Sequence, residues 1–152
     1  MENRVIFLGK KSHKELFKYY VMGDVFLQPS IGHEAFGITV IEAMASGLPV
    51  VGSINGGIKE LVKEGTNGYL FNPYRENFLE EFCKKIELAY KKKDFLGNNA
   101  RKFVEENYSW EICAEKLLLL IERSFYEKGS NVCRPLSSYS SYKRSSCRNL
   151  DL

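Results

Sequence analysis

Residues 30–51, SIGHEAFGITVIEAMASGLPVV, constrain the fold of this chain more than any other stretch. A short apolar run at residues 25–27 precedes them and predicts a strand, and a polar loop with Glu34 follows it. A glycine then opens a helix predicted over residues 38–46, and a further strand begins at Leu48. This strand–loop–helix–strand unit brings a carboxylate, a glycine turn and a helix N-terminus to one point. Such a point suits an anionic, hydroxyl-rich ligand.

Strands and helices are expected to alternate through residue 71, which predicts an α/β fold. The expected strands are residues 5–8, 25–27, 48–52 and 69–71, and the expected helices are 13–21, 38–46, 58–63, 76–92, 94–107 and 110–126. The run at 5–8 is continuous in apolar residues, so it predicts a strand buried on both faces. We therefore expect a Rossmann-like parallel sheet with helices on both faces and a C-terminal helical segment. Ligands of such sheets bind at the carboxyl ends of the strands.

Charge divides the chain into a body and a tail. Residues 1–128 hold 18 Lys and Arg against 18 Asp and Glu, whereas residues 129–152 hold four against one and include seven serines. The neutral body argues against nucleic acid as a partner. The tail is expected to be disordered or loosely held. The alternative is an unnatural or frameshifted end. The predicted domain is residues 1–128, with the Ser-rich basic tail at 129–152.

Cysteine and histidine usage argues against a metal site. The four cysteines have no CxxC spacing, and the sequence has only two histidines. Cys83 and Cys113 are expected to be small buried residues within helices, which fits a reducing cytoplasm. His13 has no partner in view and is expected to be incidental. No Asp-x-Asp occurs, so no metal is expected on a diphosphate.

Glu34 and Glu42 stand eight residues apart within a longer string. Around them lie Pro29-Ser30, Phe36-Gly37, Glu42-Ala43-Met44-Ala45, Gly47-Leu48-Pro49-Val50-Val51, Gly56-Gly57 and Glu60. The string resembles the donor-binding, C-terminal domain of retaining GT-B glycosyltransferases, family 4 (glycosyl transferases group 1). The similarity runs from about residue 5 to residue 125. It implies part of the C-terminal half of a GT-B fold, incomplete at its N-terminal side.

The resemblance implies a role for each matching position. Glu34 would be the catalytic residue facing the transferred sugar, and Glu42 would grip the ribose hydroxyls. The donor sugar and phosphate would be held at Ala35, Phe36, Gly37, Ile38 and Thr39. The base would lie near Gly9 and Lys10. No cofactor or metal is implied, because in the family the helix N-terminus, together with an Arg and a Lys that have no counterpart in this sequence, neutralises the leaving phosphate.

The implied activity is transfer of a hexosyl group, with retention, from a nucleotide diphosphate sugar to a glycan, lipid or small-molecule hydroxyl. The implied partners are the donor, the acceptor and the missing N-terminal half of the enzyme, which holds the acceptor. The implied location is the cytoplasm, with peripheral contact at the cytoplasmic face of a membrane left open. One alternative is a truncated, non-catalytic module that binds nucleotide sugar or a partner. A second alternative is epimerase chemistry on nucleotide sugars, which usually requires further acidic and histidine groups that the sequence does not offer.

Overall fold

The computed structural model describes residues 4–32 and 34–127. It divides into two compact units, Met1–Tyr108 and Ser109–Leu152. The predicted boundary between body and tail lies next to residues 128–152, which are outside the described residues, so it stays a prediction.

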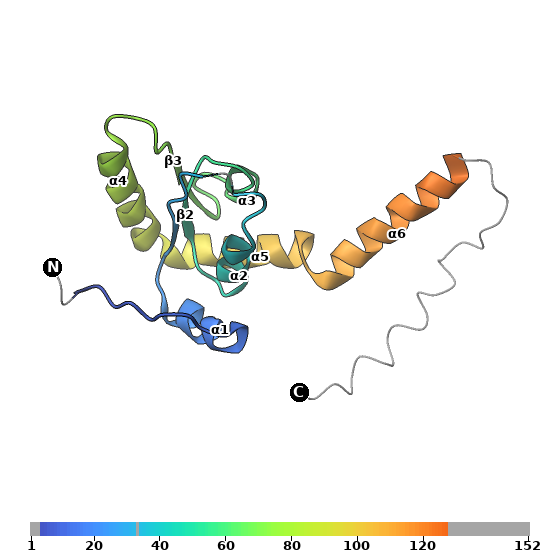
Figure 1. The fold of residues 1–152 in the computed structure, drawn as a ribbon, viewed down its shortest axis with the longest axis horizontal. Coiled ribbons are helices and arrows are strands. Elements are labelled where there is room, and N and C mark those ends of the chain that lie inside the picture. Colours follow the sequence, from blue (N-terminus) through green and yellow to red (C-terminus); the bar gives the residue numbers. More distant parts are fainter. Residues whose placement is uncertain (1–3, 33, 128–152) are drawn as a thin grey trace. The chain divides into compact units, whose positions relative to one another are not determined.

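A parallel sheet forms the centre of the first unit (Figure 1). Its strands are β1 (Phe26–Gln28), β2 (Val50–Ser53) and β3 (Gly68–Phe71), in that order. Leu27 pairs with Val51, and Val51 pairs with Tyr69. All described strands therefore run in one direction, and their carboxyl ends meet at one edge. The predicted parallel sheet is confirmed, with strand bounds one or two residues later than predicted at β1 and β2.

Helices cover both faces of this sheet, as predicted (Figure 1). The helices of this unit are α1 (His13–Met22), α2 (Ile38–Ala45), α3 (Ile58–Leu61), α4 (Phe78–Lys91) and α5 (Lys93–Asn107). Neighbouring residues of a strand point to opposite faces. Val50 accordingly packs in a cluster with residues of α2, α3 and α5, whereas Val51 packs with residues of β3, α4 and α5. Every residue of β2 is buried, which explains its run of small and branched side chains.

The second unit contains α6 (Trp110–Glu127). The hydroxyl of Ser109 accepts a hydrogen bond from the backbone N–H of Ile112 at 3.3 Å and so caps the start of this helix. The apolar residues of α6 from Leu117 to Ile121 are exposed. Over the described residues, no helix combines the length and apolar character needed to cross a membrane.

The buried strand predicted at residues 5–8 is wrong. These residues form no ladder with β1, β2 or β3, and the side chain of Phe7 is 94% exposed. An apolar run becomes a strand only when a neighbouring strand satisfies its N–H and C=O groups. The apolar pattern alone did not carry that information.

The prediction that Cys83 and Cys113 are buried is also wrong, because both are exposed free thiols. On α4 the inward positions are taken by Phe82, Ile86 and Ala89. These residues recur at helical spacing, which leaves Cys83 beside the buried stripe rather than in it.

Candidate functional site

Gly37 fixes the start of α2. It is buried, and its backbone is in the left-handed region, at φ +85° and ψ 50°, where residues with a Cβ are strained. An added Cβ would lie 3.3 Å from Cδ1 of Leu61. The N-cap residue is this glycine, which has no side chain to cap the helix. The first helical residues, Ile38 and Thr39, are exposed. The helix thus presents its first-turn N–H groups, with about half a positive charge, at the carboxyl edge of the sheet.

Glu34 lies at this helix N-terminus. Its Oε1 accepts a hydrogen bond from the backbone N–H of Gly37 at 3.2 Å. Between these residues Ala35 and Phe36 are exposed, and the Phe36 ring meets Tyr108 edge-on with 5.9 Å between centroids. Four of the predicted donor-site residues are therefore exposed beside a buried glycine. A carboxylate at a helix N-terminus is electrostatically favoured.

Two glycines after β2 hold the Glu34 loop through backbone contacts. The N–H of Gly57 donates to the carbonyl oxygen of Glu34 at 2.9 Å. A Cβ on Gly56 would lie 2.0 Å from that oxygen, and a Cβ on Gly57 would lie 2.9 Å from the carbonyl oxygen of Ala35. The loop therefore rests directly on the glycine pair, which has no room for a side chain.

Polar side chains hold the other end of the loop. Ser53 Oγ donates to the carbonyl of Ser30 at 2.7 Å, and Asn55 Nδ2 donates to the same carbonyl at 2.9 Å. Asn55 Nδ2 also reaches the carbonyl of Ile31 at 3.0 Å, and the Tyr74 hydroxyl donates to it at 2.9 Å. The sequence reasoning missed these supporting residues. Their only signal was their place at or shortly after the carboxyl ends of β2 and β3, where ligands bind in such folds.

Glu42 is a half-buried residue of α2 whose side chain contacts α1. Its Oε2 accepts a hydrogen bond from the Tyr20 hydroxyl at 3.1 Å, and its Oε1 lies 3.4 Å from Nδ1 of His13. Burial, together with the neighbouring Glu42 carboxylate, raises the pKa of Tyr20 to about 12. The expectation that His13 has no partner is wrong. The two residues are 29 positions apart, so local sequence gave no sign of the contact.

A cavity of about 240 Å³ lies beside this group. It is lined by His13, Leu16, Phe17, Tyr20, Glu42, Ala45 and Ser46. Glu34 is not among the lining residues, so the structure places the two acids in different surroundings. Glu34 faces the start of α2, whereas Glu42 faces α1.

The positions predicted to bind the base are exposed. Gly9 has a φ of +66° with open space where a Cβ would be, and Lys10 is exposed beside it. Among residues 4–32 and 34–127, no three His, Cys, Asp or Glu side chains gather to hold a metal ion. The predicted roles of all these residues remain predictions.

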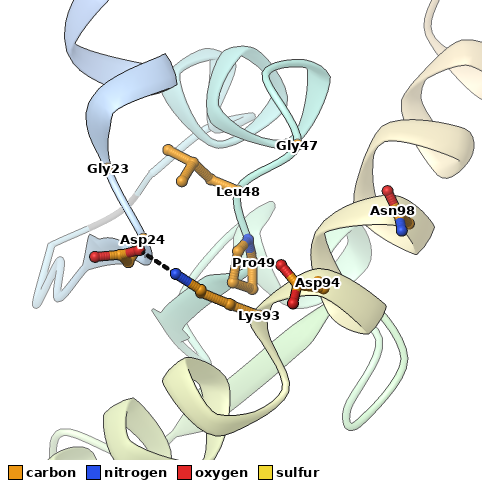
Figure 2. A pocket seen from close by; sticks show the side chains of 8 residues that line it. All are labelled: Gly23, Asp24, Gly47, Leu48, Pro49, Lys93, Asp94 and Asn98. Atoms are coloured by element: carbon orange, nitrogen blue, oxygen red, sulfur yellow. Dashed lines mark hydrogen bonds and ion pairs between the residues drawn. The ribbon is translucent and has the colours of Figure 1, made fainter.

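A second hollow lies at the opposite edge of the sheet, where Asp24 precedes β1 and Pro49 precedes β2 (Figure 2). It has a volume of about 220 Å³ and is lined by Gly23, Asp24, Gly47, Leu48, Pro49, Lys93, Asp94 and Asn98. Figure 2 shows the Lys93 ammonium paired with the Asp24 carboxylate, at 2.6 Å. This ion pair joins the start of α5 to the chain before β1.

Comparison with known proteins places this arrangement in a family. The family model for glycosyl transferases group 1 matches residues 1–103. A sucrose synthase from Denitrovibrio acetiphilus is 37% identical over 116 residues, which cover 73% of this chain and 15% of that protein. An uncharacterized glycosyltransferase from Methanocaldococcus jannaschii is 35% identical over 116 residues, covering 76% of this chain and 30% of that protein. The chain thus spans a third or less of the length of these relatives.

Solved structures of similar fold support the same family. A sucrose-phosphate synthase from Thermosynechococcus elongatus aligns with a TM-score of 0.70 and 34% identity, over 82% of this chain and 31% of that one. Anabaena HepE in complex with UDP aligns with a TM-score of 0.70 and 27% identity, over 80% of this chain and 33% of that one. The sheet, its helices and the match over residues 1–103 together give the identification. The chain belongs to the glycosyl transferases group 1 family, as a fragment of its GT-B type domain.

Proposed function

We propose that this chain is the donor-binding part of a retaining glycosyltransferase. It would bind a nucleotide diphosphate sugar, whose hexosyl group passes to a glycan, lipid or small-molecule hydroxyl. One observation carries the proposal. The N-terminus of α2 has no side-chain cap, begins at a left-handed glycine and stands beside the carboxylate of Glu34. The family membership gives that arrangement its chemical meaning.

The diphosphate would lie against the start of α2. The exposed first turn offers the amides of Ile38 and Thr39, and the helix dipole adds about half a positive charge. Gly37, with no side chain, lets the ligand approach the backbone closely. Anabaena HepE was solved with UDP, with UDP and glucose, and with UDP-glucose, which supports a nucleotide sugar as the ligand here.

Glu34 is proposed as the catalytic residue. Its carboxylate accepts a hydrogen bond from the N–H of Gly37. A phosphate at the start of α2 would compete for the same N–H. Two anions cannot both bind that amide favourably, so donor binding would turn Glu34 from the helix toward the sugar. There the carboxylate would accept hydrogen bonds from sugar hydroxyls and stabilise positive charge that develops at the anomeric carbon.

Glu42 is proposed to bind the ribose, and Gly9 and Lys10 are proposed to lie near the base. A carboxylate has about four lone-pair sites, so Glu42 can accept from ribose hydroxyls while it accepts from Tyr20. Hydrogen bonds to a charged group contribute about 1.5–3 kcal/mol each. Transfer without a metal is part of the same proposal, and it is supported by the absence of Asp-x-Asp from the sequence.

Calorimetric titration of the chain with UDP tests the nucleotide-binding role. Glu42→Ala should weaken binding about tenfold or more, because it removes the acceptor of the ribose hydroxyls. Glu60→Ala, at an exposed acid of α3, is the matched control and should leave the affinity unchanged. Equal affinities in the wild type and Glu42→Ala reject the role given to Glu42. Retention is tested in a completed enzyme by determining the anomeric configuration of the product.

The alternative is a module that binds nucleotide sugar or a partner without turnover. It is favoured by the charge at the start of α2, because half a unit of helix charge leaves most of a diphosphate's charge unbalanced. We expect the chain alone to transfer sugar poorly or not at all. Transfer from a radiolabelled donor, detected with this chain alone, contradicts that expectation and favours the enzyme.

A further inference from the structure

The carboxylate of Glu42 is engaged on both of its oxygens by α1. The Tyr20 hydroxyl donates to Oε2 at 3.1 Å, and Nδ1 of His13 lies 3.4 Å from Oε1. The side chain of Glu42 is 24% exposed, whereas that of His13 is 81% exposed. The two contacts therefore differ in kind. One comes from a residue packed into the protein, and the other comes from a residue at the surface that is easily displaced.

Tyr20 is held firmly from a second direction. Its ring meets Phe26 of β1 edge-on, with 5.8 Å between centroids and 68° between planes. The side chain is thus fixed by the sheet at its ring and by Glu42 at its hydroxyl. A tyrosine hydroxyl keeps its proton at neutral pH, and with its pKa raised to about 12 that of Tyr20 also remains a donor in alkaline solution. Tyr20 can therefore fix one oxygen of Glu42 continuously.

The cavity beside Glu42 offers space for a ligand next to its carboxylate. Its walls come from α1 and α2, with apolar side chains at Leu16 and Phe17 and polar groups at Glu42 and Ser46. At about 240 Å³ it has room for a sugar ring next to the carboxylate. His13 lines the same cavity, so a ligand bound there lies beside the histidine.

We propose that Tyr20 is a positioning residue, which orients Glu42 toward the ribose of the donor, and that His13 holds the second oxygen until the ribose hydroxyls displace it. This inference rests on the proposed nucleotide-binding role of Glu42. Tyr20 itself makes no contact with the sugar in this proposal. The effect of Tyr20 on binding passes through Glu42 and depends on the ribose hydroxyls.

Tyr20→Phe tests the inference, because it removes the hydroxyl and keeps the ring contact with Phe26. We expect the dissociation constant for UDP, measured by NMR titration of the full chain, to rise about three- to tenfold. Tyr19→Phe, on the same helix, is the control and should bind as the wild type does. Equal melting temperatures in the three proteins show that folding is unchanged.

The same titrations with 2′,3′-dideoxy-UDP separate positioning from a structural role. A ligand without ribose hydroxyls has nothing to donate to Glu42, so Tyr20→Phe and wild type should bind it equally. An equal loss for both ligands, or no loss for UDP, overturns the inference. If Glu42→Gln still weakens UDP binding, the proposed function survives that result. A wild-type chain that binds no nucleoside diphosphate overturns both.

His13→Ala completes the test. Removing a contact that competes with the ribose should leave UDP binding as tight as in the wild type, or up to about threefold tighter. The Hε1 resonance of His13 should shift when UDP is added to the wild type, and His33→Gln identifies which of the two histidine signals is which. Weaker binding in His13→Ala, or an unmoved resonance, overturns the displacement of His13.

Discussion

Gly56→Ala should destabilise the chain by about 2–5 kcal/mol, because two costs combine at this glycine. Its φ is +53°, in the left-handed region, where an L-residue costs about 1–2 kcal/mol. The added Cβ would lie 2.0 Å from the carbonyl oxygen of Glu34, and forcing an extra carbon into a packed site costs about 1–3 kcal/mol. That sum is a large part of the 5–15 kcal/mol by which domains are stable.

Gly65→Ala is the matched control. Gly65 also has a positive φ, +70°, but nothing lies within 4 Å of its would-be Cβ. Its cost is therefore the backbone strain alone, and the entropy lost from the unfolded chain on replacing glycine is the same in both variants. Urea unfolding of the two variants should show Gly56→Ala to be less stable by about 1–3 kcal/mol, the cost of the contact. UDP binding should weaken only in Gly56→Ala, because only that change moves the Glu34 loop. Equal unfolding midpoints would refute the reasoning that this loop rests on the glycine.

Three further changes test other parts of the site. Glu34→Gln should remove detectable transfer from a completed enzyme while UDP affinity falls less than twofold, as rate and binding assays would show; full activity would reject the catalytic role. Asn55→Ala removes hydrogen bonds to Ser30 and Ile31 and should cost about 1–3 kcal/mol in thermal unfolding, whereas an unchanged melting temperature would mean that the loop does not depend on them. The raised pKa of Tyr20 favours its neutral form in the folded chain, so its stabilising effect is full below pH 10 and is lost as the pH rises through about 12. Absorbance titration of the tyrosines should show a late ionisation that Tyr20→Phe abolishes.

The sequence predicted those features that local pattern determines. The apolar runs around β1, β2 and β3 and the glycine that starts α2 gave the parallel sheet and the helix N-terminus beside Glu34. Residues 5–8 show where this reasoning fails, since an apolar run does not reveal whether a partner strand is present. The exposure of Cys83 shows a second failure, in which neighbouring residues took the inward face of the helix.

The contacts that shape the site were beyond local reasoning. Tyr74 reaches the carbonyl of Ile31 across 43 positions, and Tyr20 reaches Glu42 across 22. Only the tertiary arrangement of the strands brings such pairs together. Spacing and the resemblance singled out Glu34 and Glu42 as candidates, whereas the residues that contact them are evident only in the structure.

The loop that follows β1 is supported by its peptide carbonyls. Ser53, Asn55 and Gly57 all donate to main-chain oxygens, at Ser30, Ile31 and Glu34. Every amino acid supplies such an oxygen, so these hydrogen bonds do not depend on which side chains the loop carries. Exposed positions such as Ile31 and Ala35 are therefore open to exchange without loss of the scaffold. If the loop binds the donor as proposed, one fixed support can carry different ligand preferences, and the loop is the place to redesign them.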